Sequence, residues 1–185
     1  MPTYYEFDIA LQEVEPRIWR RLQLPADATF LDLHDAIQDA CGWQNYHLFA
    51  FRDEYGESIA GIPDDEWGEP DPDAAKVLVA DFFESEPRCL YEYDFGDSWL
   101  HAVRLRRIVE SSERFERRLL DGARAFPSED CGGVQGYEEC VEVTRGGEDP
   151  EGLRDWLGDW DPERFDLDQV RQAFDRPCQP PPTLD

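Results

Sequence analysis

The segment from Tyr91 to His101, with the sequence Tyr-Glu-Tyr-Asp-Phe-Gly-Asp-Ser-Trp-Leu-His, gathers the side chains best suited to chemistry in this chain of 185 residues. It holds four aromatic residues, two aspartates, a glycine and one of the three histidines. Carboxylate oxygens and imidazole nitrogens are ligands for divalent cations, whereas aromatic rings offer large contact areas to a partner. The residue types therefore admit either a metal-dependent reaction or recognition of a partner.

A second chemical segment runs from Phe126 to Glu139 and contains two acids followed by three glycines. Glycine lets the backbone approach other segments closely, so we expect this glycine turn to fold back on the tip of the first segment. The donors that would then meet suit Mn, Mg, Zn or non-haem Fe, and they are Asp94, Asp97, His101, Glu129, Asp130 and, as a further candidate, His47.

The spacing of these donors matches no metal-binding motif, and aspartates in turns commonly accept hydrogen bonds from backbone amides. We therefore predict no metal and no other cofactor, with a divalent metal as the alternative. The side chains next to these acids decide between a cluster without metal and a divalent-metal site. Partners such as Arg20, Arg21 or Arg104 would make a structural charge network, whereas a cluster without arginine would hold repelling carboxylates that need a cation.

The elements that position these residues begin with a β-hairpin over 91–105, where apolar and polar residues alternate. We expect a three-residue loop, because it sets Phe95 opposite Trp99 and Tyr93 opposite His101 and so aligns the apolar rows of both strands. His101 would then point into an aromatic face. Upstream, alternation over 4–11 and 18–25 predicts a long N-terminal hairpin.

A Thr-x-x-Asp start at Thr29 and helical spacing of apolar residues predict a helix over 29–41 that ends at Gly42, with His34 on its core face. A short strand is expected over 47–51. The order of hairpin, helix, strand and hairpin predicts an α+β fold with an antiparallel, β-grasp-like sheet and one packed helix.

The remaining segments are expected to be a long acidic surface loop over 56–74, a short helix over 77–83, and a helix after the glycine turn that Asp130 caps. C-terminal helices should follow, one of them capped by Asp166.

The domain prediction is one domain over 1–176, with a core over 3–145 and a helical extension over 146–176, and then a disordered Pro-rich tail over 177–185.

The charge balance is strongly acidic, with 43 acidic and 18 basic residues and a net charge of −25. Duplex nucleic acid is disfavoured as a partner, because binding it depends on Lys and Arg neutralising phosphates. A protein or peptide partner that is basic fits better. The arginines Arg17, Arg20 and Arg21 around Trp19 are expected to lie over the ring and pair with nearby carboxylates.

The five cysteines are scattered and form no Cys-x-x-Cys pair, which suits free thiols in a reducing compartment. No run approaches the roughly 20 apolar residues of a membrane span, and the N-terminal residues lack the pattern of a signal peptide. The sequence therefore predicts a cytoplasmic protein without a membrane partner.

Five motifs in order resemble the plasmid pRiA4b ORF-3-like family over roughly residues 3 to 145. They are Pro16-Arg17-Ile18-Trp19-Arg20-Arg21; Leu33-His34-Asp35 with Ile37-Gln38; Gly42-Trp43 with His47-Leu48; Tyr93-Asp94-Phe95-Gly96-Asp97 with Trp99 and His101; and Pro127 with Glu129-Asp130-Cys131-Gly132-Gly133 and Gly136-Tyr137-Glu138.

The resemblance implies a compact α+β domain of unestablished activity, often found near mobile elements and sometimes labelled resolvase-like. Members commonly show His-Leu-His-x-Phe where this chain has His47-Leu48-Phe49-Ala50-Phe51, so the second histidine is absent. A serine recombinase needs a nucleophilic serine among arginines and a basic DNA-binding helix pair, and the acidic chain offers neither. We therefore predict no recombinase activity.

The function expected from the sequence is that of a non-catalytic binding or adaptor domain, and the alternative is a metal-dependent hydrolase or nuclease. The expected recognition surface combines the hairpin and the glycine turn, and its residues are Asp94, Gly96, Asp97, Trp99, His101, Glu129, Asp130, Gly132, Gly133 and Tyr137.

Overall fold

The structure is a computed structural model that describes residues 1–63 and 70–177. These residues form an α+β fold whose sheet pairs every neighbouring strand antiparallel. In sheet order the described strands are β4 (Ser58–Gly61), β3 (Phe49–Arg52), β5 (Arg88–Tyr93), β6 (Trp99–Glu110), β1 (Thr3–Leu11), β2 (Trp19–Pro25), β7 (Phe115–Ala123) and β8 (Arg176–Pro177).

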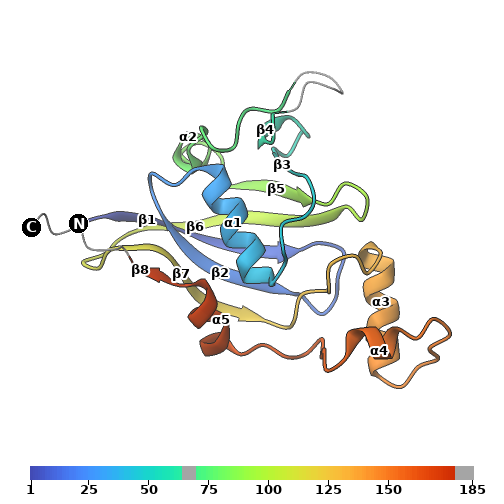
Figure 1. Ribbon diagram of the computed structural model, residues 1–185. Coiled ribbons are helices and arrows are strands. Elements are labelled where there is room, and N and C mark those ends of the chain that lie inside the picture. The colour runs from blue at the N-terminus through green and yellow to red at the C-terminus, as the bar shows by residue number, and fades with distance from the viewer. Residues whose placement is uncertain (64–69, 178–185) are drawn as a thin grey trace, which may run out of the picture.

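The helices occupy one face and one end of this sheet (Figure 1). The described helices are α1 (Phe30–Cys41), α2 (Val79–Phe83), α3 (Gly133–Thr144), α4 (Leu153–Leu157) and α5 (Leu167–Phe174). In Figure 1, α1 crosses the sheet and α5 lies beside β7, whereas α3 and α4 stand beyond the loop that joins β5 to β6. This end of the sheet is where the two chemical segments lie.

Helix α1 forms as the sequence predicts. The Thr29 hydroxyl accepts a hydrogen bond from the Asp32 amide and the Asp32 carboxylate accepts one from the Thr29 amide, which together make a capping box. Gly42 ends the helix with a φ of 79°, a conformation that glycine adopts without steric cost. The face towards the sheet is buried, and it includes His34 as predicted.

Both predicted hairpins are present, and they join at the centre of the sheet, where β1 of the N-terminal hairpin pairs with β6 of the other. Phe7 and Ile9 on the core face of β1 are 0% exposed. On its other face the buried carboxylates of Glu6 and Asp8 are neutralised by arginines, with Glu6 3.0 Å from Arg107 and Asp8 2.8 Å from Arg21. Arg21 also lies over the Trp19 ring, as expected, with its guanidinium carbon 5.3 Å from the ring centroid.

Three strands differ from the sequence predictions, and one of them is β8, which stands where a helical extension and a tail are expected. The segment Ser58–Gly61 was predicted as part of a loop and is instead strand β4, because its amides pair with β3. The strand β7 was not predicted, since Phe-Glu-Arg-Arg-Leu-Leu-Asp-Gly-Ala alternates only weakly and its place is set by pairing with β2 across a bulge.

The short helix predicted over 77–83 is confirmed as α2, and the Asp166 cap of α5 is confirmed by a 3.0 Å hydrogen bond from the Gln169 amide. Of the predicted acidic loop, residues 64–69 lie outside the described residues, as does the predicted tail from 178 onward. Pro177 is described and pairs with Phe115 in the sheet. None of the helices in the described residues is long and apolar enough to cross a membrane.

The capping box of α1 gives a direct test of local stabilisation. Replacing Thr29 by alanine removes the hydroxyl that accepts the Asp32 amide, and we expect the free energy of unfolding to fall by about 1 kcal/mol in urea titrations. Thr29→Ser keeps the acceptor and should retain most of that stability. Equal losses in the two variants would show that the hydroxyl does not stabilise the helix.

Candidate functional site

The tip of the β5–β6 hairpin is a five-residue loop from Asp94 to Ser98, since Tyr93 pairs with Trp99. The predicted three-residue loop is therefore wrong. The Asp94 carboxylate accepts the Gly96 amide at 3.0 Å, and the Asp94 carbonyl accepts the Ser98 amide at 2.6 Å. These local bonds end the strand pairing early, because an aspartate at the strand end offers the backbone an alternative to the ladder.

The pairing is displaced by two residues from the predicted register, so each side chain keeps its predicted face. Tyr91 now lies opposite His101, and both are buried on the core face. Phe95 leaves the strand and is 47% exposed.

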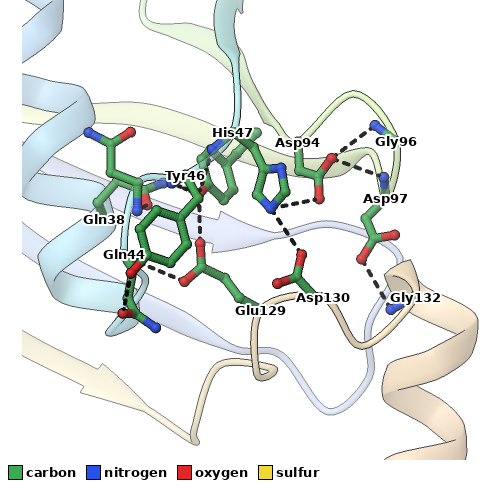
Figure 2. Close-up of polar contacts among 12 residues, drawn as sticks. Gln38, Gln44, Tyr46, His47, Asp94, Gly96, Asp97, Glu129, Asp130 and Gly132 are labelled. Atoms are coloured by element: carbon green, nitrogen blue, oxygen red, sulfur yellow. Dashed lines mark hydrogen bonds and ion pairs between the residues drawn. The ribbon is translucent and has the colours of Figure 1, made fainter.

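The glycine turn reaches this tip, as the sequence predicts. The Gly132 amide donates a hydrogen bond of 3.1 Å to the Asp97 carboxylate (Figure 2). A Cβ on Gly133 would lie 2.8 Å from the Asp97 carbonyl oxygen, and Gly133 has a φ of +69°. Glycine is required here both for the backbone conformation and for the close contact.

Asp130 does not cap α3, contrary to the sequence prediction, because the N-cap is Gly132 and no side chain caps the helix. The Asp130 carboxylate turns instead to His47, whose Nε2 lies 2.9 Å from its Oδ1. The same Nε2 lies 3.6 Å from Oδ2 of Asp94. The ligand atoms of these three residues all lie within 4.8 Å of one another, and Figure 2 shows both carboxylates directed at the same imidazole nitrogen.

Histidine 47 is held by the loop between α1 and β3, which a buried polar network fixes in place. The Tyr93 hydroxyl accepts the amides of Tyr46 and His47 at 3.0 and 3.3 Å. His34 Nε2 lies 2.8 Å from Oδ1 of Asn45, and Gln38 accepts the Asn45 amide at 3.1 Å. The position of His47 is therefore set by side chains from α1 and β5, which its own sequence neighbours do not reveal.

Among the described residues, the ion pairs of Asp94 and Asp130 are made with His47 alone. The side chain of Asp94 is only 13% exposed, whereas that of Asp130 is 64% exposed. The arginines that the sequence offered as partners lie elsewhere, with Arg21 on Asp8 and Arg20 inside the protein. The cluster therefore has the arrangement without arginine, in which two carboxylates approach the same nitrogen of one imidazole.

The other candidate ligands are committed to different contacts. Asp97 accepts the Gly132 amide, and Glu129 accepts the Tyr93 hydroxyl at 2.6 Å and the Gln44 amide at 2.7 Å. Burial and the bond to Glu129 raise the pKa of the Tyr93 hydroxyl, which therefore stays a donor. The five-residue metal set proposed from the sequence is not brought together as one set.

His101 is fully buried, as its aromatic face predicts, and stacks on Phe126 with ring centroids 5.8 Å apart. Its Nδ1 lies 3.1 Å from the Trp99 carbonyl, whereas its Nε2 has no hydrogen-bond partner among the described residues. Burial lowers the pKa of His101 to about 4, which keeps the imidazole neutral. Trp99 and Tyr137 are also buried, so three members of the expected recognition surface support the site from within rather than contact a partner.

Of the remaining members, Gly133 is buried against Asp97, whereas Gly96 and Gly132 are exposed at the tip. Phe49, which stands where the family commonly has a second histidine, stacks on His34 with ring centroids 3.6 Å apart. That position lies in the core, so the absent second histidine removes nothing from the His47 cluster.

A groove of about 840 Å³ opens between the end of α1, the glycine turn and the helices α4 and α5. Its aromatic lining consists of Trp43, Tyr46, Phe126, Trp156, Trp160 and Phe165, and the groove reaches Glu129 and Asp130 at the tip.

Arg20 lines the groove and is 4% exposed, with no carboxylate partner among the described residues. It donates to the carbonyls of Ala40, Trp19 and Ala123, and it lies between the rings of Phe126 and Phe165. Burial lowers its pKa to about 10. The prediction that Arg20 pairs with a carboxylate is wrong, because its position in the interior matches it to backbone carbonyls.

The chain is similar to a protein family and to individual proteins within and beyond the solved structures. The family described as plasmid pRiA4b ORF-3-like protein matches residues 3–169, which extends the likeness beyond residue 145 into the C-terminal helices. An uncharacterized protein of Sinorhizobium fredii is 33% identical over 176 residues, which is 90% of this chain and 88% of that protein. A crystal structure of a protein of unknown function from Methanosarcina mazei Go1 is 38% identical with a TM-score of 0.83, covering 92% of this chain and 97% of that one.

The contact between Gly133 and Asp97 can be tested with a matched pair of glycine variants. Gly133→Ala places a methyl group 2.8 Å from the Asp97 carbonyl oxygen, whereas Gly152→Ala has a similar φ of +74° with nothing within 4 Å. Left-handed backbone costs alanine about 1–2 kcal/mol at either position, so we expect Gly133→Ala to lose clearly more stability in urea titrations. Faster hydrogen exchange at the Gly132 amide should accompany the loss. Equal losses in the two variants would contradict the close contact.

The buried His101 predicts a specific pH dependence. Its pKa is about 4 in the folded state and 6.5 in a solvated chain, so the unfolded state binds more protons between these values. Its contribution to stability is complete above pH 6.5 and is lost as the pH falls towards 4, at about 1.4 kcal/mol per pH unit. We expect the unfolding free energy of His101→Phe to fall less steeply over this range than that of the wild type. Identical slopes would contradict the neutral, buried imidazole.

Proposed function

The chain belongs to the plasmid pRiA4b ORF-3-like family, and we propose that it is a non-catalytic binding domain that recognises an extended, basic segment of a partner protein. The observation that carries this proposal is the exposure of apolar side chains around the tip, with Tyr46 71%, Leu48 48% and Phe95 47% exposed. Grouped apolar residues rimmed by polar ones are typical of interaction sites.

The groove supports the proposal because its lining includes two exposed aromatic side chains, those of Tyr46 and Trp156, which are 71% and 52% exposed. Aromatic side chains supply most of the binding energy at many protein interfaces, since they bury a large area with little loss of conformational freedom. A segment bound in the groove could contact both Tyr46 and Trp156, since both side chains line it.

The preference for a basic partner rests on charge. The net charge of −25 attracts cationic segments and opposes phosphate backbones. The acids that line the groove, Asp39, Glu129, Asp130 and Asp166, outnumber its two arginines, Arg20 and Arg164, which also favours a basic segment.

The proposal also covers the domain organisation, the type of fold and the cellular location of the protein. A single domain over residues 1–176 is supported by Phe174 of α5, which is 0% exposed in the core cluster that also holds Phe7. We also propose that the sheet and the helix α1, which crosses one of its faces, together make a β-grasp-like arrangement (Figure 1). A cytoplasmic location is supported by the free cysteines Cys41, Cys89, Cys131 and Cys140, and an association with mobile elements by the family likeness.

Selection from a displayed library of random peptides tests this function. We expect the wild type to enrich peptides that carry Arg or Lys beside apolar residues, with affinities that weaken as salt is added. The double variant Tyr46→Ala, Trp156→Ala should bind the enriched peptides at least about tenfold more weakly, because it removes two exposed aromatic contacts.

The matched control is Tyr55→Ala, which removes an aromatic side chain that is 83% exposed at the turn between β3 and β4. This control should keep the wild-type affinity. The proposal fails if no peptide is enriched, or if the Tyr55 variant loses as much affinity as the double variant.

A further inference from the structure

We propose that His47, Asp94 and Asp130 form a binding site for one divalent transition-metal ion of the Mn²⁺, Fe²⁺ or Zn²⁺ class. The proposal goes beyond peptide recognition, because it concerns a different set of side chains and does not require a partner. It rests on the geometry of one imidazole and two carboxylates whose ligand atoms lie within 4.8 Å of one another.

The distances suit a single ion. Ligand atoms bound to one ion at about 2.0–2.2 Å are separated by roughly 3.0–3.4 Å for octahedral and tetrahedral angles. His47 Nε2 lies 2.9 Å from Oδ1 of Asp130 and 3.6 Å from Oδ2 of Asp94, on either side of that range. The third separation, between the oxygens of Asp94 and Asp130, is at most 4.8 Å, so side-chain adjustments would bring the three atoms around one centre.

The carboxylate of Asp94 is already oriented for this role. Its Oδ1 accepts the amides of Gly96 and Asp97 at 3.0 and 3.4 Å, which leaves Oδ2 facing the imidazole. Hydrogen bonds that hold one oxygen of a ligating carboxylate fix the direction of the other. The hairpin tip thus presents one free carboxylate oxygen to the cluster (Figure 2).

The other recessed carboxylates of this protein pair with arginines, and Asp94 differs from them in a way that favours a bound cation. Glu6 and Asp8 have side chains 3% and 8% exposed, and each pairs with an arginine at 3.0 Å or less. Asp94 is comparably recessed at 13%, yet the basic side chain within 4.0 Å of it in the described part of the chain is His47 alone, which carries a charge only when protonated. A half-buried carboxylate beside a second carboxylate is stabilised by a positive charge, which a metal ion would supply.

The mixed donor set selects the class of metal. Imidazole nitrogen suits Zn, Fe and Ni, carboxylate oxygen suits Mn and Mg, and one nitrogen with two oxygens lies between these preferences. Calcium takes six to eight oxygen ligands, which this cluster does not offer. The exposed side of the site, at Asp130, leaves room for water to complete the coordination.

Titration of the chelator-treated full chain with Mn²⁺, followed by the electron paramagnetic resonance signal of the free ion, tests the site. Manganese is the probe because it prefers oxygen and imidazole to the thiols of Cys41 and Cys131. We expect one Mn²⁺ per chain, displaced by Zn²⁺ and not by equimolar Ca²⁺. His47→Gln and Asp130→Asn should each weaken the affinity at least tenfold.

Two controls make the result decisive. Asp159→Asn changes a carboxylate that is 100% exposed and distant in the sequence, and it should keep the wild-type Mn²⁺ affinity. The double variant Tyr46→Ala, Trp156→Ala should also keep it, so loss of peptide binding and loss of metal binding are separate outcomes. Circular dichroism without metal should show His47→Gln folded, since His47 is partly exposed. The proposal is overturned if the wild type binds no Mn²⁺ at submillimolar concentration, or if the folded His47 variant binds it equally well.

Discussion

The approach of the glycine turn to the hairpin tip is the contact on which the candidate site depends. Gly132 donates its amide to the Asp97 carboxylate, and Gly133 lies so close to the Asp97 carbonyl that no side chain fits between them. This backbone contact brings Asp130 beside His47, from which it is separated by 83 residues in the chain. The close contact depends on the absence of a side chain at Gly133, since a Cβ there would push the two segments apart.

The buried carboxylates of Glu6 and Asp8 in β1 each form ion pairs with arginine side chains. Asp8 is held by Arg21 and Arg106, and although burial raises the pKa of its carboxyl, the hydrogen bonds from both arginines leave the pKa below its usual value. The tip receives no such partner within the described residues, and its carboxylates face an imidazole instead. In a chain of net charge −25, this uneven distribution distinguishes a structural charge network from the cluster for which we propose a cation.

The polar groups beneath α1 have a positioning role that extends to the surface. His34, Gln38 and the hydroxyl of Tyr91 form one buried hydrogen-bonded group, and through Asn45 it holds the loop that carries His47. Burial lowers the pKa of His34 to about 4, so this network contains no buried charge. A neutral and fully bonded network is rigid, and it therefore fixes a surface histidine from below.

The sequence by itself determined the local elements: the two hairpins, α1 with its capping box, the core position of His34 and the approach of the glycine turn to the tip. Periodicity and capping residues act within a few residues, and clustered glycines mark backbone that can approach another segment, so these features can be read without a structure. The hairpin register depends on local turn bonds of Asp94, which the alternation of apolar residues does not reveal. Tertiary structure decided the strand β7, the interior position of Arg20 and the choice of His47 over His101 beside Asp94. These outcomes depend on hydrogen bonds and packing between distant segments, and neither periodicity nor spacing along the chain encodes which of two histidines will face a given carboxylate.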